Sequence, residues 1–79
     1  MNIEIYSKQN CVFCDKAKIT LQKYNPKILM LDVDYKRNDF FNKFPNAKTF
    51  PQIIINKNHV GGYSELKNWL ENNTFDEDF

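Results

Sequence analysis

The sequence predicts one α/β domain whose strands and helices follow the order β-α-β-α-β-β-α. Short apolar segments suited to strands alternate with segments of helical spacing, and prolines stand at several of the boundaries. A Gly-Gly pair at 61–62 separates the last strand from the last helix. Two strands joined by a helix are expected to be parallel, and the last two strands should form an antiparallel hairpin. The expected architecture is therefore a four-stranded mixed sheet flanked by three helices.

The first half of the chain contains two strand candidates on either side of one helix. Ile3–Tyr6 alternates apolar and polar residues, as a half-buried strand does. Apolar residues then recur at helical spacing, at Cys14, Ala17, Leu21 and Tyr24. Pro26 ends that helix, because the residue before a proline avoids the helical region. The continuous apolar segment Ile28–Val33 is expected to form a buried strand.

The second half is expected to hold a short helix, a hairpin and a final helix. The short helix ends at Pro45 and carries three inward-facing rings, those of Phe40, Phe41 and Phe44. Gln52–Ile55 predicts a strand, and His59–Val60 predicts a brief returning strand. Ser64 is expected to cap the last helix. Its predicted inward face comprises Leu66, Trp69 and Leu70.

Length, charge and hydropathy limit the classes of protein that this chain can be. The 79 residues carry 11 basic and 10 acidic side chains, so no strong field attracts nucleic acid. Apolar segments are far shorter than a bilayer requires, and we expect neither membrane association nor a secretory signal. We therefore expect a cytoplasmic monomer. Residues 1–73 are expected to form the domain, and residues 74–79 an acidic C-terminal tail.

Cys11 and Cys14 are the chain's two cysteines, and they have C-x-x-C spacing. Two thiols and one histidine, His59, are too few for a closed zinc site, so no metal is expected. His59 lies on the predicted hairpin away from the cysteines, and a structural role is expected for it. A purely structural disulfide is also a poor interpretation, since closing so short a loop contributes only about 1.9 kcal/mol. The spacing next to a β-α-β pattern therefore predicts a redox-active dithiol.

The position of the cysteines predicts how they divide the chemistry. Cys11 follows the first strand at the expected start of the first helix, where unpaired amides and the helix dipole stabilise an anion. Lys8, three residues earlier, adds positive charge. These effects lower the pKa of a thiol. We therefore expect Cys11 to be the attacking nucleophile and Cys14, one turn further along, to resolve the mixed disulfide.

Three sequence blocks together resemble the glutaredoxin family. The blocks are Ile5-Tyr6-Ser7-Lys8 with Cys11-Val12-Phe13-Cys14, then Thr49-Phe50-Pro51-Gln52, then Gly61-Gly62-Tyr63-Ser64. The resemblance covers Ile3 to about Leu70 and implies a thioredoxin fold. It also implies glutathione-dependent reduction of protein disulfides and glutathionylated thiols, with a separate glutathione reductase regenerating the glutathione. Val12 departs from the commonest dithiol members, which have proline there.

The resemblance also implies which residues bind glutathione. They are Lys8, Phe13, Thr49, Phe50, Pro51, Gly62, Tyr63 and Ser64. In the family the proline that matches Pro51 has a cis peptide bond, and the residue before it offers its backbone to the cysteinyl part of glutathione. The corner that matches Gly62–Ser64 holds the γ-glutamyl carboxylate. Ser64 stands where many members have aspartate, and Lys8 and Lys48 are candidates for the glycyl carboxylate.

Two alternative functions remain open at this stage. One is a glutaredoxin-like redoxin recharged by thioredoxin reductase that donates electrons to ribonucleotide reductase. Such redoxins also have valine after the first cysteine, but they usually lack the Thr-x-Pro and Gly-Gly-aromatic pair in the form present here. The other is a non-enzymatic iron–sulfur carrier, because some family members without the active-site proline bind such a cluster between two chains.

Overall fold

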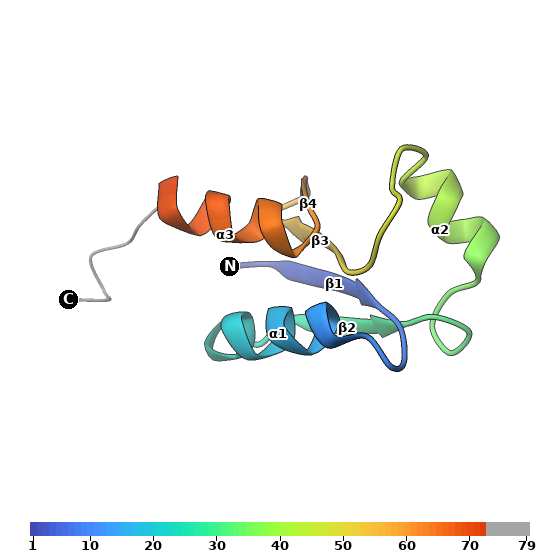
Figure 1. Ribbon diagram of the computed structural model, residues 1–79, viewed down its shortest axis with the longest axis horizontal. Helices are drawn as coiled ribbons and strands as arrows, with labels where there is room; N and C mark the ends of the chain where they lie inside the picture. The colour runs from blue at the N-terminus through green and yellow to red at the C-terminus, as the bar shows by residue number, and fades with distance from the viewer. Residues whose placement is uncertain (73–79) are drawn as a thin grey trace.

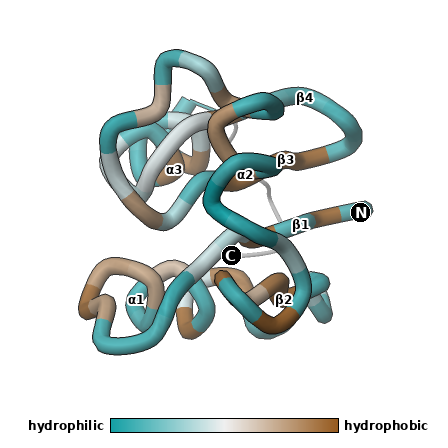
Figure 2. The backbone as a smooth tube through the Cα atoms, turned by 90° about the vertical axis from the view of Figure 1, so that its right-hand side faces the viewer, coloured by the Kyte–Doolittle hydropathy of each residue, from teal (hydrophilic) through white to brown (hydrophobic). Residues whose placement is uncertain are grey.

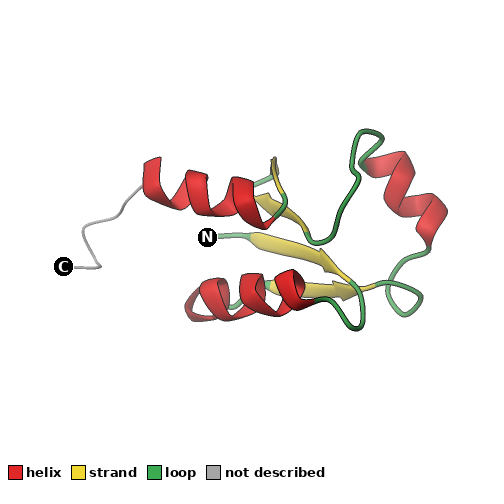
Figure 3. Ribbon diagram, viewed as in Figure 1, coloured by secondary structure: helices red, strands yellow, loops and turns green. Residues whose placement is uncertain are grey.

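The computed structural model describes residues 1–72, and the predicted tail at 74–79 lies outside them. The observed element order matches the predicted one and adds a short 3₁₀ helix (Figure 1, Figure 3). The elements are β1 Ile3–Ser7, α1 Val12–Leu21, η1 Gln22–Tyr24, β2 Lys27–Met30, α2 Arg37–Lys43, β3 Gln52–Ile55, β4 Asn58–Gly61 and α3 Tyr63–Asn72. Within residues 1–72, none of the helices has the length and apolar character needed to cross a bilayer.

The four strands form one mixed sheet in the order β2-β1-β3-β4. β1 is parallel to β2, as expected for strands that are joined through a helix. β1 is antiparallel to β3, with Tyr6 opposite Gln52, and β3 is antiparallel to β4. The mixed sheet and the final hairpin are therefore as predicted.

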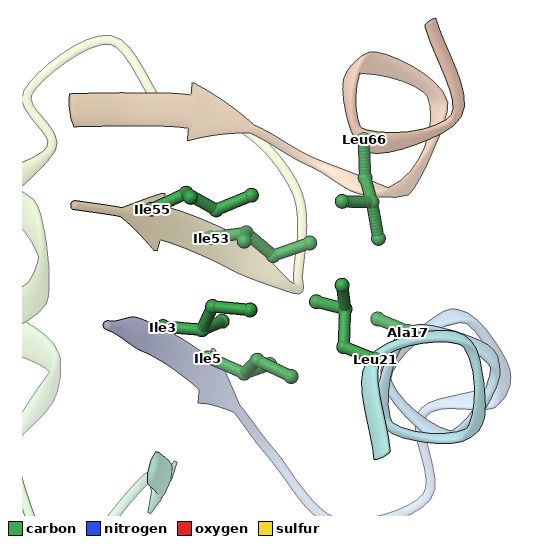
Figure 4. Close-up of a cluster of buried hydrophobic side chains, with 7 residues drawn as sticks. All are labelled: Ile3, Ile5, Ala17, Leu21, Ile53, Ile55 and Leu66. Atoms are coloured by element: carbon green, nitrogen blue, oxygen red, sulfur yellow. The ribbon is translucent and has the colours of Figure 1, made fainter. Parts of the chain in front are cut away.

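The main core lies between one face of the sheet and helices α1 and α3. Alternate residues of β1 and β3 point towards the two helices, which lie on the same side of these strands (Figure 4). The buried cluster consists of Ile3, Ile5, Ala17, Leu21, Ile53, Ile55 and Leu66. Trp69 and Leu70 pack against it, so the predicted inward face of the last helix is confirmed. In the hydropathy colouring, the strands that supply these side chains, β1 and β3, carry hydrophobic segments (Figure 2).

Helix α2 lies at the end of the sheet where β1 ends (Figure 1) and is attached there by aromatic rings. Phe40 and Phe44 are buried, and the Phe44 ring contacts Tyr6 with a centroid distance of 5.1 Å. The prediction that Phe41 also faces inward was wrong, since 40% of its surface is exposed. Residues four apart share a helix face, whereas Phe41 is rotated away from Phe40 by a quarter turn or more.

The second strand ends earlier than the sequence predicts, at Met30 rather than Val33. The chain turns there: the amides of Val33 and Asp34 donate to the Met30 carbonyl at 3.1 and 2.8 Å. Asp32 has a φ of 68°, in the left-handed region, and the Asp34 carboxylate accepts a hydrogen bond from the Met30 amide. Val33 is consequently 74% exposed. An apolar segment alone does not reveal where such a turn replaces the strand.

Tyr35 connects this turn to the end of β1. Its hydroxyl donates to the Ser7 carbonyl at 2.6 Å, and its ring stacks on Phe40. Burial is the main cause that raises the pKa of Tyr35 to about 12, and the charges of Tyr6 and Asp32 add to it. The tyrosine therefore stays protonated in the fold at pH values where an unfolded tyrosine ionises.

Truncation of a core side chain should destabilise the fold far more than truncation of an exposed one on the same helix. Leu21 is fully buried, whereas Ile19 is 66% exposed. We predict that Leu21→Ala lowers the free energy of unfolding by about 2–5 kcal/mol, because it removes buried apolar surface and leaves a cavity. Ile19→Ala, the matched control, should change it by about 0.5 kcal/mol or less. Urea unfolding measures both, and equal effects would contradict this core assignment.

The free energy of unfolding should also fall in alkaline solution, because Tyr35 loses its proton there. An unfolded tyrosine ionises near pH 10, whereas Tyr35 in the fold keeps its proton to about pH 12. The folded state therefore binds the proton more strongly than the unfolded state does. The resulting contribution to the free energy of unfolding is complete below pH 10 and is lost as the pH rises towards 12. Urea midpoints of Tyr35→Phe should fall less steeply above about pH 10 than those of the unchanged chain. Parallel declines would refute the assignment.

Candidate active site

Cys11 and Cys14 form a disulfide at the start of α1, with their Cα atoms 5.2 Å apart. Cys11 is the N-cap residue, in an extended conformation, and Cys14 lies in the first turn of the helix. Cys14 is fully buried, whereas Cys11 is partly exposed. An external sulfur can therefore approach Cys11 but not Cys14, which is the arrangement that the predicted division of roles requires.

The backbone of α1 provides the electrostatic environment of Cys11. The Cys14 amide donates to the Cys11 Sγ at 3.2 Å. When the pair is reduced, this amide and the positive end of the helix dipole favour the thiolate of Cys11 over the thiol. The thiolate is the form that attacks a disulfide, so the start of the helix favours the reactive form of Cys11.

The segment before β3 reaches the cysteine pair from the other side. The Phe50–Pro51 peptide bond is cis, as the resemblance implied, and Pro51 is buried. The Phe50 carbonyl oxygen lies 3.9 Å from the Cys11 Sγ. Lys8 places its Nζ over the Phe50 ring, 5.5 Å from the centroid. The exposed Lys8 ammonium is therefore held at the rim of the site by a cation–π contact.

A groove of about 290 Å³ runs beside this segment. Its lining residues are Phe13, Thr49, Phe50, Gly62, Tyr63, Ser64 and Glu65. Six of them are among the eight predicted ligand residues. Of the other two, Pro51 is buried next to the groove, and Lys8 lines a separate hollow with residues 9 and 31–33. The rings of Phe13 and Tyr63, with centroids 5.8 Å apart, connect the cysteine helix to α3.

The start of α3 forms the far end of the groove, and it differs from the prediction. The helix begins at Tyr63, so Ser64 lies within its first turn and is not the cap. The cap is made by Gly62, whose carbonyl accepts from the Leu66 amide at 2.9 Å. The Glu65 carboxylate accepts from the Gly62 amide, also at 2.9 Å. Glu65, three residues after the cap, therefore makes one half of a capping box, whereas Gly62 has no side chain to accept from the amides of the first turn.

Glu65 was missed in the sequence, although its spacing from Gly62 was a usable signal. Its carboxylate lies at the groove end where the first amides of α3 gather. Gly62 permits a close approach there, since a Cβ at this residue would lie 3.3 Å from the Pro51 carbonyl. The corner therefore presents both amide donors and one negative charge to a ligand.

The other basic candidate lies elsewhere. Lys48 is exposed and, together with Lys43 and His59, lines a neighbouring hollow. This hollow shares Thr49, Gly62 and Glu65 with the groove. Val12 and Phe13 are 66% and 53% exposed, so an apolar surface lies next to Cys11. Within the described part of the chain, no group of three or more metal-ligating side chains comes together.

Comparisons with known proteins agree with this geometry. A family model described as Glutaredoxin matches residues 3–60. Glutaredoxin 3 of Escherichia coli is 35% identical over 68 residues, covering 82% of this chain and 81% of that protein. Glutaredoxin 1 of Francisella tularensis, solved with cacodylate, superposes with a TM-score of 0.75 at 26% identity and covers 90% and 93% of the two chains.

A buckwheat glutaredoxin solved in complex with glutathione shares the fold, with a TM-score of 0.68 at 16% identity over 90% of this chain and 69% of that one. The family match extends over most of the chain and includes both cysteines and the cis proline. This chain belongs to the glutaredoxin family: it has the thioredoxin fold and a C-x-x-C dithiol, and it is a thiol–disulfide oxidoreductase.

Proposed function

We propose that this chain uses glutathione to reduce protein disulfides and glutathionylated thiols, with Cys11 as the nucleophile and Cys14 as the resolving thiol. The observation that carries the proposal is the groove from Phe13 to the start of α3, which runs past Phe50, whose carbonyl oxygen lies 3.9 Å from the Cys11 sulfur. A tripeptide whose central thiol must meet Cys11 needs a groove that extends from that sulfur.

The groove has groups that suit the ends of glutathione. The γ-glutamyl end carries a carboxylate and an ammonium group, and the first amides of α3 favour the carboxylate. Glu65, at the same corner, favours the ammonium group. Phe50 offers its backbone to the cysteinyl part, and Thr49 and Tyr63 enclose it. Lys8 is the candidate for the glycyl carboxylate, from its position over the Phe50 ring.

In the proposed reaction the Cys11 thiolate attacks the glutathione sulfur of a glutathionylated thiol. The Cys11–glutathione disulfide forms and the substrate leaves as its thiolate. A second glutathione thiolate attacks the bound glutathione sulfur, which yields oxidised glutathione and restores the Cys11 thiolate. With a protein disulfide, the Cys11 thiolate first attacks one protein sulfur and forms a mixed disulfide, and the other protein sulfur leaves as its thiolate. Cys14 then attacks the Cys11 sulfur, which releases the reduced protein and leaves the Cys11–Cys14 disulfide. Two glutathione molecules reduce this disulfide to the dithiol and become one molecule of oxidised glutathione. Glutathione reductase returns oxidised glutathione to the thiol.

The proposed partners follow from this chemistry. They are glutathione and proteins with accessible disulfides, with ribonucleotide reductase as one candidate. The exposed Val12 and Phe13 give a protein substrate an apolar surface to contact next to Cys11. We place this activity in the cytoplasm, where glutathione keeps thiols reduced, and we propose that the chain acts as a monomer.

The reductant requirement tests the proposal most directly. With a small mixed disulfide of glutathione as substrate, we predict that NADPH is consumed in the presence of glutathione and glutathione reductase. The expected reason is that glutathione, held in the groove, completes the second half of the cycle. Turnover with thioredoxin reductase alone, and none with glutathione, would overturn the glutathione assignment while leaving the dithiol chemistry intact.

The two cysteines should separate the two activities. We predict that Cys14→Ser keeps most of the deglutathionylation and loses at least about 90% of dithiol-dependent protein disulfide reduction, since only the latter needs a resolving thiol. Cys11→Ser, the matched control, should lose both because the attacking sulfur is gone. Insulin precipitation follows the protein disulfides and the coupled NADPH assay follows deglutathionylation. Equal loss of both activities in Cys14→Ser would refute its assignment as a resolving residue only.

A further inference from the structure

Gln52 is a buried polar side chain outside the residues that line the glutathione groove. Only 4% of its surface is exposed, and it directly follows the cis proline at the start of β3. The strand register places Gln52 opposite Tyr6 and Ile54 opposite His59. Because side chains alternate along a strand, Gln52 and His59 point to the α2 side of the sheet, away from the main core. A buried amide needs partners, and Gln52 has two.

The two hydrogen bonds of Gln52 determine its orientation. Its Nε2 donates to the Thr49 carbonyl at 2.9 Å, and its Oε1 lies 2.7 Å from the His59 Nε2. A backbone carbonyl only accepts, so the amide nitrogen must face Thr49 and the amide oxygen must face His59. His59 must then carry a proton on Nε2. The chain of contacts runs from β4 through the buried amide to the backbone of the groove.

We propose that Gln52 and His59 are positioning residues that hold the Thr49 carbonyl and thereby fix the Thr49–Pro51 segment beside Cys11. This role rests on the proposed function, because the ligand that the segment receives is taken to be glutathione. Thr49 and Phe50 both line the groove, and the Phe50 carbonyl lies 3.9 Å from the Cys11 Sγ. A rotation of the Thr49–Phe50 peptide would displace Phe50. Both the groove wall and the Phe50 carbonyl would then move relative to Cys11.

A second set of contacts supports the same segment through its side chain. The centroid of the His59 ring lies 4.6 Å from that of the Phe44 ring, and the centroids of Phe44 and Phe40 are 5.3 Å apart. Phe40 stacks on Phe50 at 4.4 Å. His59 therefore reaches Phe50 through rings and Thr49 through Gln52. His59 is exposed to water and Gln52 is not, so loss of the Gln52 amide should have the larger effect.

The test compares variants that remove single contacts. Gln52→Met keeps the length of the side chain without its hydrogen bonds, and Gln52→Glu retains an acceptor for His59 but cannot donate to Thr49. In both, we expect the KM for glutathione to rise about threefold to tenfold while kcat changes less than about twofold. His59→Phe keeps the ring contact and should raise KM about twofold. His59→Gln keeps a donor for the Gln52 Oε1, so its KM should equal that of the unchanged chain.

Asn58→Ala, at the neighbouring exposed residue of β4, is the control and should leave KM unchanged. Urea unfolding accompanies each variant, so that loss of folded protein is not mistaken for weaker binding. A wild-type KM in Gln52→Met would overturn the proposal. A fall in kcat that only parallels a loss of folded protein, with KM unchanged, would also overturn it.

An NMR readout separates this proposal from the proposed function. If the unchanged chain shows no glutathione-dependent turnover, the proposed function fails, and the positioning role is judged on the amide shifts alone. Gln52→Met should then shift the amides of Thr49, Phe50, Cys11 and Gly62, whereas Asn58→Ala should not. The ¹⁵N spectrum of neutral His59 should show the proton on Nε2. Changes confined to β3 and β4, or a proton on Nδ1, would overturn the positioning role.

Discussion

The antiparallel pairing of β1 with β3 is the constraint on which the site depends. Its register sets Tyr6, near the end of β1, opposite Gln52, the first residue of β3. The loop that carries Cys11 leaves β1 at the same end of the sheet at which the segment with the cis Pro51 enters β3. Residues about 40 positions apart in sequence therefore meet, and the Phe50 carbonyl comes within 3.9 Å of the Cys11 sulfur. A shift of one residue in this register would separate them and would also turn the buried isoleucines to the other face.

The same two strands serve stability on one face and the site on the other. Ile5 and Ile53 point into the core with α1 and α3, while Tyr6 and Gln52 point towards α2. Burial of the first face supplies most of the hydrophobic stabilisation. The second face is smaller and aromatic, and it contains the buried amide that reaches the Thr49 carbonyl. Support of the groove is therefore part of the packing of α2 rather than an addition to the groove itself.

The sequence was sufficient for features that are specified locally. Strand alternation, helical spacing and C-x-x-C placed the elements and the cysteines, and the resemblance placed the cis proline. It was insufficient where a turn or the packing of a helix overrides the apolar pattern. The strand after Pro26 ends at Met30 because the chain turns there, with the Asp34 carboxylate accepting from the Met30 amide, and Phe41 faces outward. Ser64 looked like the cap because serine is a common cap, but the helix begins at Tyr63, so Gly62 is the cap and Glu65 accepts from its amide. The link between His59 and Gln52 needs the β3–β4 register, which no local pattern contains.

Much of the candidate site consists of backbone, which explains which residues carried the family resemblance. The groups around Cys11 are the Cys14 amide and the Phe50 carbonyl, and those at the far end of the groove are the first amides of α3. Backbone groups are placed by residues that set the path of the chain. Gly61 has a φ of 121°, where a Cβ would lie 2.9 Å from the Glu65 side chain. Pro51 and the two glycines thus determine the geometry, whereas Val12 and Ser64 contribute side chains to a frame that is already set. Differences at Val12 and Ser64 should therefore tune reactivity and affinity more than they alter the chemistry.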